Sequence, residues 1–349
     1  MIGDVLRGVV PLLPFFCLAL GLSALFGFTL LWIHQRWKPS KREEASRLPQ
    51  KNAVSRFGGV GLLLAFVISL LLWPGFQFSP TIGALLSGGV LILFFGILDD
   101  IRPISWWWQL AFQLLLGGLL VFLGLKIEIM QGPFGGTVDF REWFSGMPLV
   151  ILLLWLLLVM NAVNWLDGLD GLLGSVVCIG FGTLTLVSFF PEVRQPGLAG
   201  PSSILLGATL AFLFFNWPPG RIIAGTVGSY FLGFALAVLA ISAGAKIATT
   251  VLVLIIPILD ALFVLWERWR SGTSLFHPDG RHLHYRLREL GWSEKQIAVL
   301  YSLITLGMAL LALSTQTLGK LLVFLGATLG LTLLSVLVQG WSQKIIPRV

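Results

Sequence analysis

Long apolar runs separated by short polar segments fill almost the whole chain. About eleven of them are long enough to cross about 30 Å of hydrocarbon as a helix, which rises about 1.5 Å per residue. They lie at residues 8–33, 58–74, 81–98, 106–125, 147–163, 172–190, 202–216, 227–243, 247–266, 297–315 and 319–338. The pattern predicts an all-α, polytopic membrane protein with about eleven transmembrane helices, forming one integral-membrane domain over residues 1–349.

The composition supports this fold class. Hydrophobic residues make up 56% of the chain and charged residues only 11%, against about 25% charged residues in soluble domains. Of the 23 Lys and Arg residues, 17 fall on one side of the predicted membrane and 6 on the other. Because basic loops remain in the cytoplasm, we expect the N-terminus outside and the C-terminus inside, with cytoplasmic loops near 34–57, 99–105, 161–171, 216–226 and 267–296. The net charge of +7 then lies beside anionic lipid, and no nucleic-acid partner is expected.

Two adjacent acids, Asp99 and Asp100, follow the apolar run that ends at Leu98. Carboxylates at the end of a membrane span are costly unless they bind something, and neighbouring carboxylates repel unless they share a cation or a proton. The pair is therefore a candidate cation or general-base site. A solvated interfacial pair beside Arg102 is the alternative.

A second polar run places a carboxamide or carboxylate at every third position: Asn161, Asn164, Asp167 and Asp170. On a helix, this spacing puts successive members along one slowly winding face. The intervening glycines predict that the end of the segment opens and lets backbone approach a ligand. Oxygen ligands at this density suit Mg²⁺, with Mn²⁺ as the alternative. Helix capping would explain one or two of the four residues.

The last long polar loop contains Arg281, His282 and His284. The two cysteines of the chain, Cys17 and Cys178, both lie in apolar runs, so no cysteine supports a zinc site. The surrounding arginines favour phosphate recognition, and an ordinary basic loop is the alternative. A glycine-rich turn before Gly228 offers either a helix N-terminus for phosphate or close helix packing.

These motifs resemble the polyprenyl-phosphate N-acetylhexosamine-1-phosphate transferases, the membrane family that includes phospho-MurNAc-pentapeptide transferase. The likeness runs from about Arg56 to Arg288 and is most specific over residues 161–172 and 274–287. It implies Mg²⁺-dependent transfer of a sugar 1-phosphate, most simply GlcNAc-1-phosphate, from a UDP-N-acetylhexosamine to undecaprenyl or similar polyprenyl phosphate. UMP would leave, and a cell-envelope glycan would begin at the cytoplasmic face of the inner (plasma) membrane.

The resemblance also assigns roles. Phosphoryl transfer depends on positioning and on charge neutralisation, which Mg²⁺ with Arg or His supplies. Catalysis and metal binding fall to Asp99, Asp100, Asp167 and Asp170. Substrate binding falls to Asn161, Asn164, Arg281, His282 and His284. The sequence leaves open whether the protein forms a homodimer.

The chain departs from the family pattern at several of these places. Thr226 stands where the family has an Asp that binds Mg²⁺, and Asp260 lies a whole helix away from it. Gln109 replaces a Lys, Tyr285 replaces the last His of the histidine motif, and residues 43–50 also differ. A catalytically impaired paralogue that binds lipid phosphate or nucleotide-sugar is therefore a second hypothesis. A cation-coupled transporter is a third, disfavoured because the acids gather at one face and no similar halves are evident.

Overall fold

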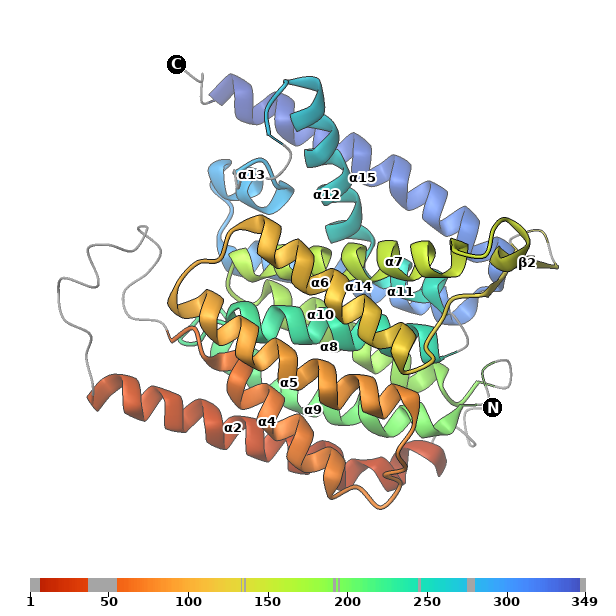
Figure 1. Ribbon diagram of the computed structural model, residues 1–349. Helices are drawn as coiled ribbons and strands as arrows, with labels where there is room; N and C mark the ends of the chain where they lie inside the picture. The colour runs from red at the N-terminus through yellow and green to blue at the C-terminus, as the bar shows by residue number, and fades with distance from the viewer. Residues whose placement is uncertain are drawn as a thin grey trace.

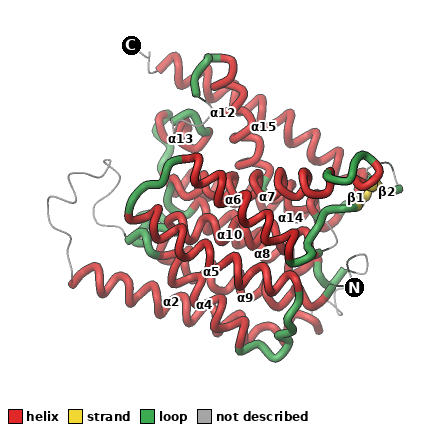
Figure 2. Tube along the Cα trace, viewed as in Figure 1, coloured by secondary structure: helices red, strands yellow, loops and turns green. Residues whose placement is uncertain are grey.

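Antiparallel helices of membrane-spanning length dominate the computed structural model (Figures 1 and 2). The structure describes residues 7–36, 55–132, 134, 136–190, 193, 195–243, 246–274 and 280–345. Its longer helices are α2 (Leu13–Arg36), α4 (Gly58–Leu71), α5 (Pro80–Ile101), α6 (Trp106–Phe122), α7 (Met147–Trp165), α8 (Leu172–Val187), α9 (Ala199–Asn216), α10 (Gly225–Ser242), α12 (Ile255–Arg270), α14 (Glu294–Ser314) and α15 (Thr317–Ile345).

Short elements connect these helices. Two are seven-residue helices, α11 (Ile247–Val253) and α13 (Leu283–Glu289). The antiparallel strands β1 (Ile129–Gln131) and β2 (Thr137–Asp139) form a hairpin between α6 and α7. Four are 3₁₀ turns: η1 (Val10–Leu12), η2 (Phe140–Glu142), η3 (Leu166–Gly168) and η4 (Pro196–Leu198).

Every apolar run predicted from the sequence coincides with a helix. Within the described residues, seven helices are long and apolar enough to cross a membrane, and the pair α11 and α12 would make an eighth. The remaining runs correspond to α4, α6 and α8, which have 14, 17 and 16 residues. The polytopic all-α class is confirmed, whereas the count of eleven spans and the orientation stay predictions.

One predicted span differs in shape. The run 247–266 is not a single straight helix, because α11 and α12 are bent by 78° at Leu254. Pro257 lies in the first turn of α12 and has no N–H to donate. Its ring would also clash with the carbonyl four residues earlier, at Val253, which is where α11 ends. The bend is therefore encoded by one residue.

The central helix of the bundle is α10, and it packs against α4, α5, α7 and α8 (Figure 1). Sixteen of its 18 residues are buried. The outer helices α2 and α15 instead expose large apolar side chains, such as Phe28 and Leu329, as lipid-facing helices do. Because α10 is buried on all sides, the residues at its ends are held in fixed positions relative to four neighbouring helices.

Small residues bring the start of α10 very close to α4 and α5. A Cβ added to Gly96 of α5 would lie 2.7 Å from the backbone nitrogen of Val227. One added to Gly59 of α4 would lie 2.6 Å from the carbonyl oxygen of Ala224. Gly59 N donates to that same carbonyl at 3.0 Å. Glycines permit such approach because they have no side chain to separate the backbones. The N-terminus of α10 is thereby held against the C-terminal half of α5.

Candidate active site

Three carboxylates converge on the first residues of α10. Thr226 N donates to Asp100 Oδ1 at 2.9 Å and to Oδ2 at 3.1 Å, and Gly225 N donates to Asp167 Oδ2 at 3.0 Å. The Thr226 hydroxyl donates to Asp99 Oδ2 at 2.6 Å. The first N–H groups of a helix lack partners within the helix and carry its positive dipole end. The structure therefore gathers acids from α5 and η3 around one helix terminus.

Asp99 also begins a hydrogen-bonded chain that runs into the bundle. Gln109 Nε2 donates to Asp99 Oδ1 at 3.3 Å, and Tyr230 OH donates to Gln109 Oε1 at 3.3 Å. Gln113 Nε2 donates to Tyr230 OH at 3.1 Å, and Asn161 Nδ2 donates to Gln113 Oε1 at 2.8 Å. Gln109, which stands where the resemblance expects a Lys, is a neutral partner of Asp99 in this chain.

The two predicted asparagines are engaged inside the bundle. Asn161 bonds to Gln113, as above, and its Nδ2 also donates to Leu157 O at 2.8 Å. Asn164 Oδ1 accepts from the Ser229 hydroxyl at 2.7 Å, which joins α7 to α10. In this geometry both amides hold helices together, and their contact with substrate stays a prediction.

Asp170 lies apart from the other three acids in its hydrogen bonding. Gly220 N donates to Asp170 Oδ2 at 2.6 Å, and Asp170 N donates to Glu294 Oε2 at 3.4 Å. The helical spacing from Asn161 to Asp170 does not persist, because α7 ends at Trp165 and Gly171 has φ +77°. The predicted opening of this segment is confirmed, and it sends Asp167 and Asp170 to different partners.

The oxygen donors at the α10 terminus have the chemistry that Mg²⁺ prefers. They are Asp99, Asp100, Asp167 and the Thr226 hydroxyl, with no nitrogen or sulfur among them. Among the described residues, no three His, Cys, Asp or Glu side chains form a ready-made metal cage. Mg²⁺ commonly uses one or two carboxylates, with water and substrate phosphates completing its shell. The donor set fits Mg²⁺ on those terms.

The histidine loop packs beside the turn that carries Asp167. The His282 ring lies 5.5 Å from the Trp165 ring and 5.6 Å from the His284 ring, measured between centroids. A Cβ added to Gly168 would lie 3.3 Å from His284 Nε2. The motifs around residues 161–170 and 281–285 are therefore neighbours in the fold. Residues 275–279, which precede this histidine loop, and residues 37–54 fall outside the described residues.

The polar residues of this loop have different surroundings. Arg281 Nη1 donates to Ser271 Oγ at 3.0 Å at the surface. His284 is 1% exposed, and its Nε2 has no hydrogen-bond partner in the described part of the chain. Burial lowers the pKa of His284 to about 4, so its imidazole is neutral at physiological pH. His284 is thus not a fixed positive charge for phosphate.

An apolar groove of about 1110 Å³ runs between α2 and α9. Its walls include Leu20, Phe28 and Leu210, and its polar end is formed by Gly220 and Arg221. The Arg221 guanidinium lies over the rings of Phe214 and Phe215, at 5.7 and 5.8 Å from their centroids. Since Gly220 N bonds to Asp170, the groove ends beside this acid.

Comparison with known proteins identifies the family. A model described as glycosyl transferase family 4 matches residues 82–244, which include all four acids and Thr226. A phospho-N-acetylmuramoyl-pentapeptide-transferase of Halalkalibacterium halodurans is 31% identical over 292 residues, covering 78% of this chain and 87% of that relative. The chain belongs to this family.

Other family 4 relatives carry names from the GlcNAc branch. A probable undecaprenyl-phosphate N-acetylglucosaminyl 1-phosphate transferase of Bacillus subtilis strain 168 is 27% identical over 273 residues, covering 76% of this chain and 73% of the relative. An undecaprenyl-phosphate alpha-N-acetylglucosaminyl 1-phosphate transferase of Yersinia pestis is 29% identical over 332 residues, covering 88% and 83%. The resemblance inferred from the motifs is confirmed, and membership favours a transferase over the transporter hypothesis.

The structure also draws in residues that the sequence analysis did not assign to the site. Gln113 lies four residues after Gln109 in an otherwise apolar helix, a spacing that places both on one face and was a usable signal. Asp260 is an isolated acid inside an apolar run, which is a signal of function in a membrane protein. Ser229 and Tyr230 carried no such signal, since hydroxyl residues are common within membrane helices.

Proposed function

We propose that this protein transfers a sugar 1-phosphate, GlcNAc-1-phosphate in the first instance, from a UDP-sugar to undecaprenyl or a similar polyprenyl phosphate. The observation that carries the proposal is the convergence of Asp99, Asp100 and Asp167 on the start of α10, beside the histidine loop. The names of the relatives support the lipid phosphate and the GlcNAc branch. The excess of basic residues on one predicted side supports an active site facing the cytoplasm, with N-terminus out, C-terminus in and eleven spans.

In the proposed reaction, an oxygen of the lipid phosphate attacks the sugar-linked phosphorus of the UDP-sugar. The bond from that phosphorus to the bridging oxygen breaks, and UMP leaves with the electron pair. The nucleophile is already an anion, so the protein's task is positioning and charge neutralisation. Bound Mg²⁺ would supply positive charge to the diphosphate, and Asp99, Asp100 and Asp167 would hold it with the Thr226 hydroxyl. Mn²⁺ would suit the same oxygen donors.

The isoprenoid chain and the phosphates of the two substrates can also be assigned to parts of the structure. The groove between α2 and α9 is lined by apolar side chains and suits an isoprenoid chain, and Arg221 at its end suits a phosphate. On the nucleotide side we assign Arg281 and His282 to the diphosphate. Asp170, which accepts a hydrogen bond from Gly220 at the end of the groove, would help to position the lipid phosphate relative to the nucleotide-sugar.

A second candidate function is binding without turnover. The Thr226 hydroxyl and the Gln109 amide both donate to Asp99. Both donors are neutral, whereas the resemblance expects a Mg²⁺-binding Asp at position 226 and a Lys at position 109. A site weakened in this way would still bind lipid phosphate or nucleotide-sugar. This is the observation that favours the impaired-paralogue hypothesis.

The deciding experiment measures UMP release by purified protein with Mg²⁺, undecaprenyl phosphate and a panel of UDP-sugars, beside an Asp99→Asn variant. We expect release that requires the lipid, favours UDP-GlcNAc and is lost in the variant. Binding of either substrate with no release from any donor would refute transfer and establish the second candidate. Release that Asp99→Asn leaves intact would refute the assignment of the site.

A further inference from the structure

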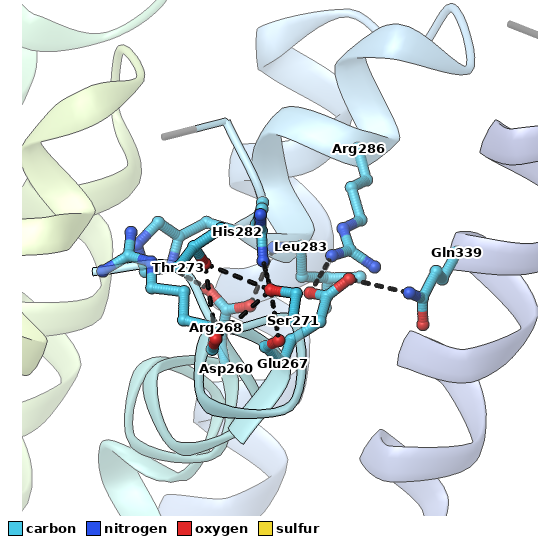
Figure 3. A network of polar contacts seen from close by, with 10 residues as sticks. Asp260, Glu267, Arg268, Ser271, Thr273, His282, Leu283, Arg286 and Gln339 are labelled. Atoms are coloured by element: carbon cyan, nitrogen blue, oxygen red, sulfur yellow. Dashed lines mark hydrogen bonds and ion pairs between the residues drawn. The ribbon is translucent and has the colours of Figure 1, made fainter. Parts of the chain in front are cut away.

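The two histidines at the start of α13 are held in different ways. Both are buried, but among the described residues only His282 has a polar partner on its ring: Nδ1 lies 2.9 Å from Asp260 Oδ2. The other carboxylate oxygen, Oδ1, accepts from Leu283 N at 2.8 Å. Within the described part of the chain these are the hydrogen bonds of the Asp260 carboxylate (Figure 3). One buried carboxylate therefore holds both the ring of His282 and the backbone that follows it.

This contact determines which nitrogen of His282 carries hydrogen. A carboxylate only accepts hydrogen bonds, so Nδ1 must keep its hydrogen whether the ring is neutral or charged. Nε2 then remains for another partner, as an acceptor in the neutral ring and as a donor to phosphate in the imidazolium. In the described residues Nε2 of His282 makes no hydrogen bond, whereas Nε2 of His284 is buried against Gly168.

The same helix contains a natural comparison. Glu267 of α12 also reaches α13, through an ion pair with Arg286, and its Oε1 accepts from Gln339 of α15 at 2.7 Å (Figure 3). It ties α12 to its neighbours as Asp260 does, but it touches no histidine. If joining helices were the whole purpose of Asp260, one oxygen on Leu283 N would suffice, and the ring contact would be superfluous.

We propose that Asp260 is a positioning residue that holds His282 with hydrogen on Nδ1, so that Nε2 is the ring nitrogen offered to the diphosphate of the nucleotide-sugar. The consequence for the reaction rests on the proposed transferase function. The consequence for the histidine does not, because the hydrogen-bond state of His282 is a property of the unliganded protein.

The first test reads the hydrogen position directly. Protein labelled with ¹⁵N in its four histidines is examined by NMR, and a His282→Gln variant assigns the signal. We expect His282 to carry hydrogen on Nδ1 in the parent protein and in Glu267→Gln. In Asp260→Asn the new amide can donate to Nδ1, so the hydrogen should move to Nε2. An unchanged His282 signal in a folded Asp260→Asn variant would overturn the proposal.

The second test reads UMP release in the same proteins. Replacing the group that orients a metal-bound histidine typically costs about 10- to 100-fold. By analogy we expect a loss of similar size in Asp260→Asn, partial recovery in Asp260→Glu and little change in Glu267→Gln. Equal losses in Asp260→Asn and Glu267→Gln would reduce Asp260 to a structural link. If the parent protein releases no UMP, the transferase function fails, and calorimetric binding of UDP-GlcNAc replaces turnover: weakening confined to Asp260→Asn supports the proposal, and equal binding in all variants overturns it.

Discussion

Replacing Thr226 by Asp should make the protein depend on a divalent cation for its stability. The Thr226 hydroxyl lies 2.6 Å from Asp99 Oδ2, and its backbone nitrogen lies 2.9 Å from Asp100 Oδ1. An Asp side chain at this position would put a further carboxylate among acids that already share one helix terminus. Like charges at such separations repel unless a cation or proton lies between them.

The size of the effect follows from the geometry. Two unit charges about 4 Å apart interact by about 4 kcal/mol at an effective dielectric constant near 20. If this repulsion lowers the free energy of unfolding by the same amount, the melting temperature of Thr226→Asp in EDTA falls by roughly 8 °C, at about 2 °C per kcal/mol. Binding of Mg²⁺ at about 100 times its dissociation constant stabilises the folded protein by about 2.7 kcal/mol, so it restores most of the lost stability. Thr226→Asn has nearly the same shape without the charge, so its melting temperature in EDTA should stay near that of the parent protein.

The assay is thermal unfolding of the three proteins in detergent, in EDTA and in millimolar Mg²⁺, followed by tryptophan fluorescence. We expect a large Mg²⁺-dependent rise for Thr226→Asp, a smaller one for the parent protein and the smallest for Thr226→Asn. Equal melting temperatures for the Asp and Asn variants in EDTA, with no difference in their response to Mg²⁺, would refute the placement of three carboxylates around residue 226.

Three further predictions concern packing, pH and lipid. Gly96→Ala should cost about 1–3 kcal/mol, because its Cβ would lie 2.7 Å from Val227 N; Gly118→Ala, whose Cβ meets nothing within 4 Å, is the matched control in thermal melts. Since burial lowers the pKa of His284 from 6.5 to about 4, the unfolded chain binds the extra proton first, and stability should fall as pH drops from about 6.5 toward 4, by at most about 3 kcal/mol. A His284→Gln variant should lose that part of the slope. Arg221→Ala should raise the KM for undecaprenyl phosphate with little change for UDP-GlcNAc, measured by UMP release; an equal rise for both substrates would contradict the lipid assignment of the groove.

The helices could be predicted from the sequence because a chain that crosses lipid can adopt few backbone conformations. Backbone N–H and C=O groups in hydrocarbon must bond within the segment, so long apolar runs at 81–98 or 297–315 become the helices α5 and α14. Even the break of the ninth run is local, since it depends on Pro257. Helix ends were predicted less well, since α4, α6 and α8 are shorter than the apolar runs that predicted them.

The site was only partly readable. The acids stand out singly, because a carboxylate at the end of an apolar run is expensive. Their partners do not stand out: Asp99 meets Thr226 across 127 positions, and Asp260 meets His282 across 22. The regular spacing from Asn161 to Asp170 predicts one shared face, yet the end of α7 at Trp165 sends Asp167 to Gly225 and Asp170 to Gly220.

The sequence by itself thus determined the fold class, the family and the acidic positions, since each depends on residues close together in the chain. Only the tertiary structure decided which of those residues face one another. That decision rests on close packing around α10, where Gly59 and Gly96 let three helices approach so closely that the first N–H groups of α10 reach carboxylates from two other segments. Such contacts depend on side-chain volumes summed over distant helices, which no local pattern contains.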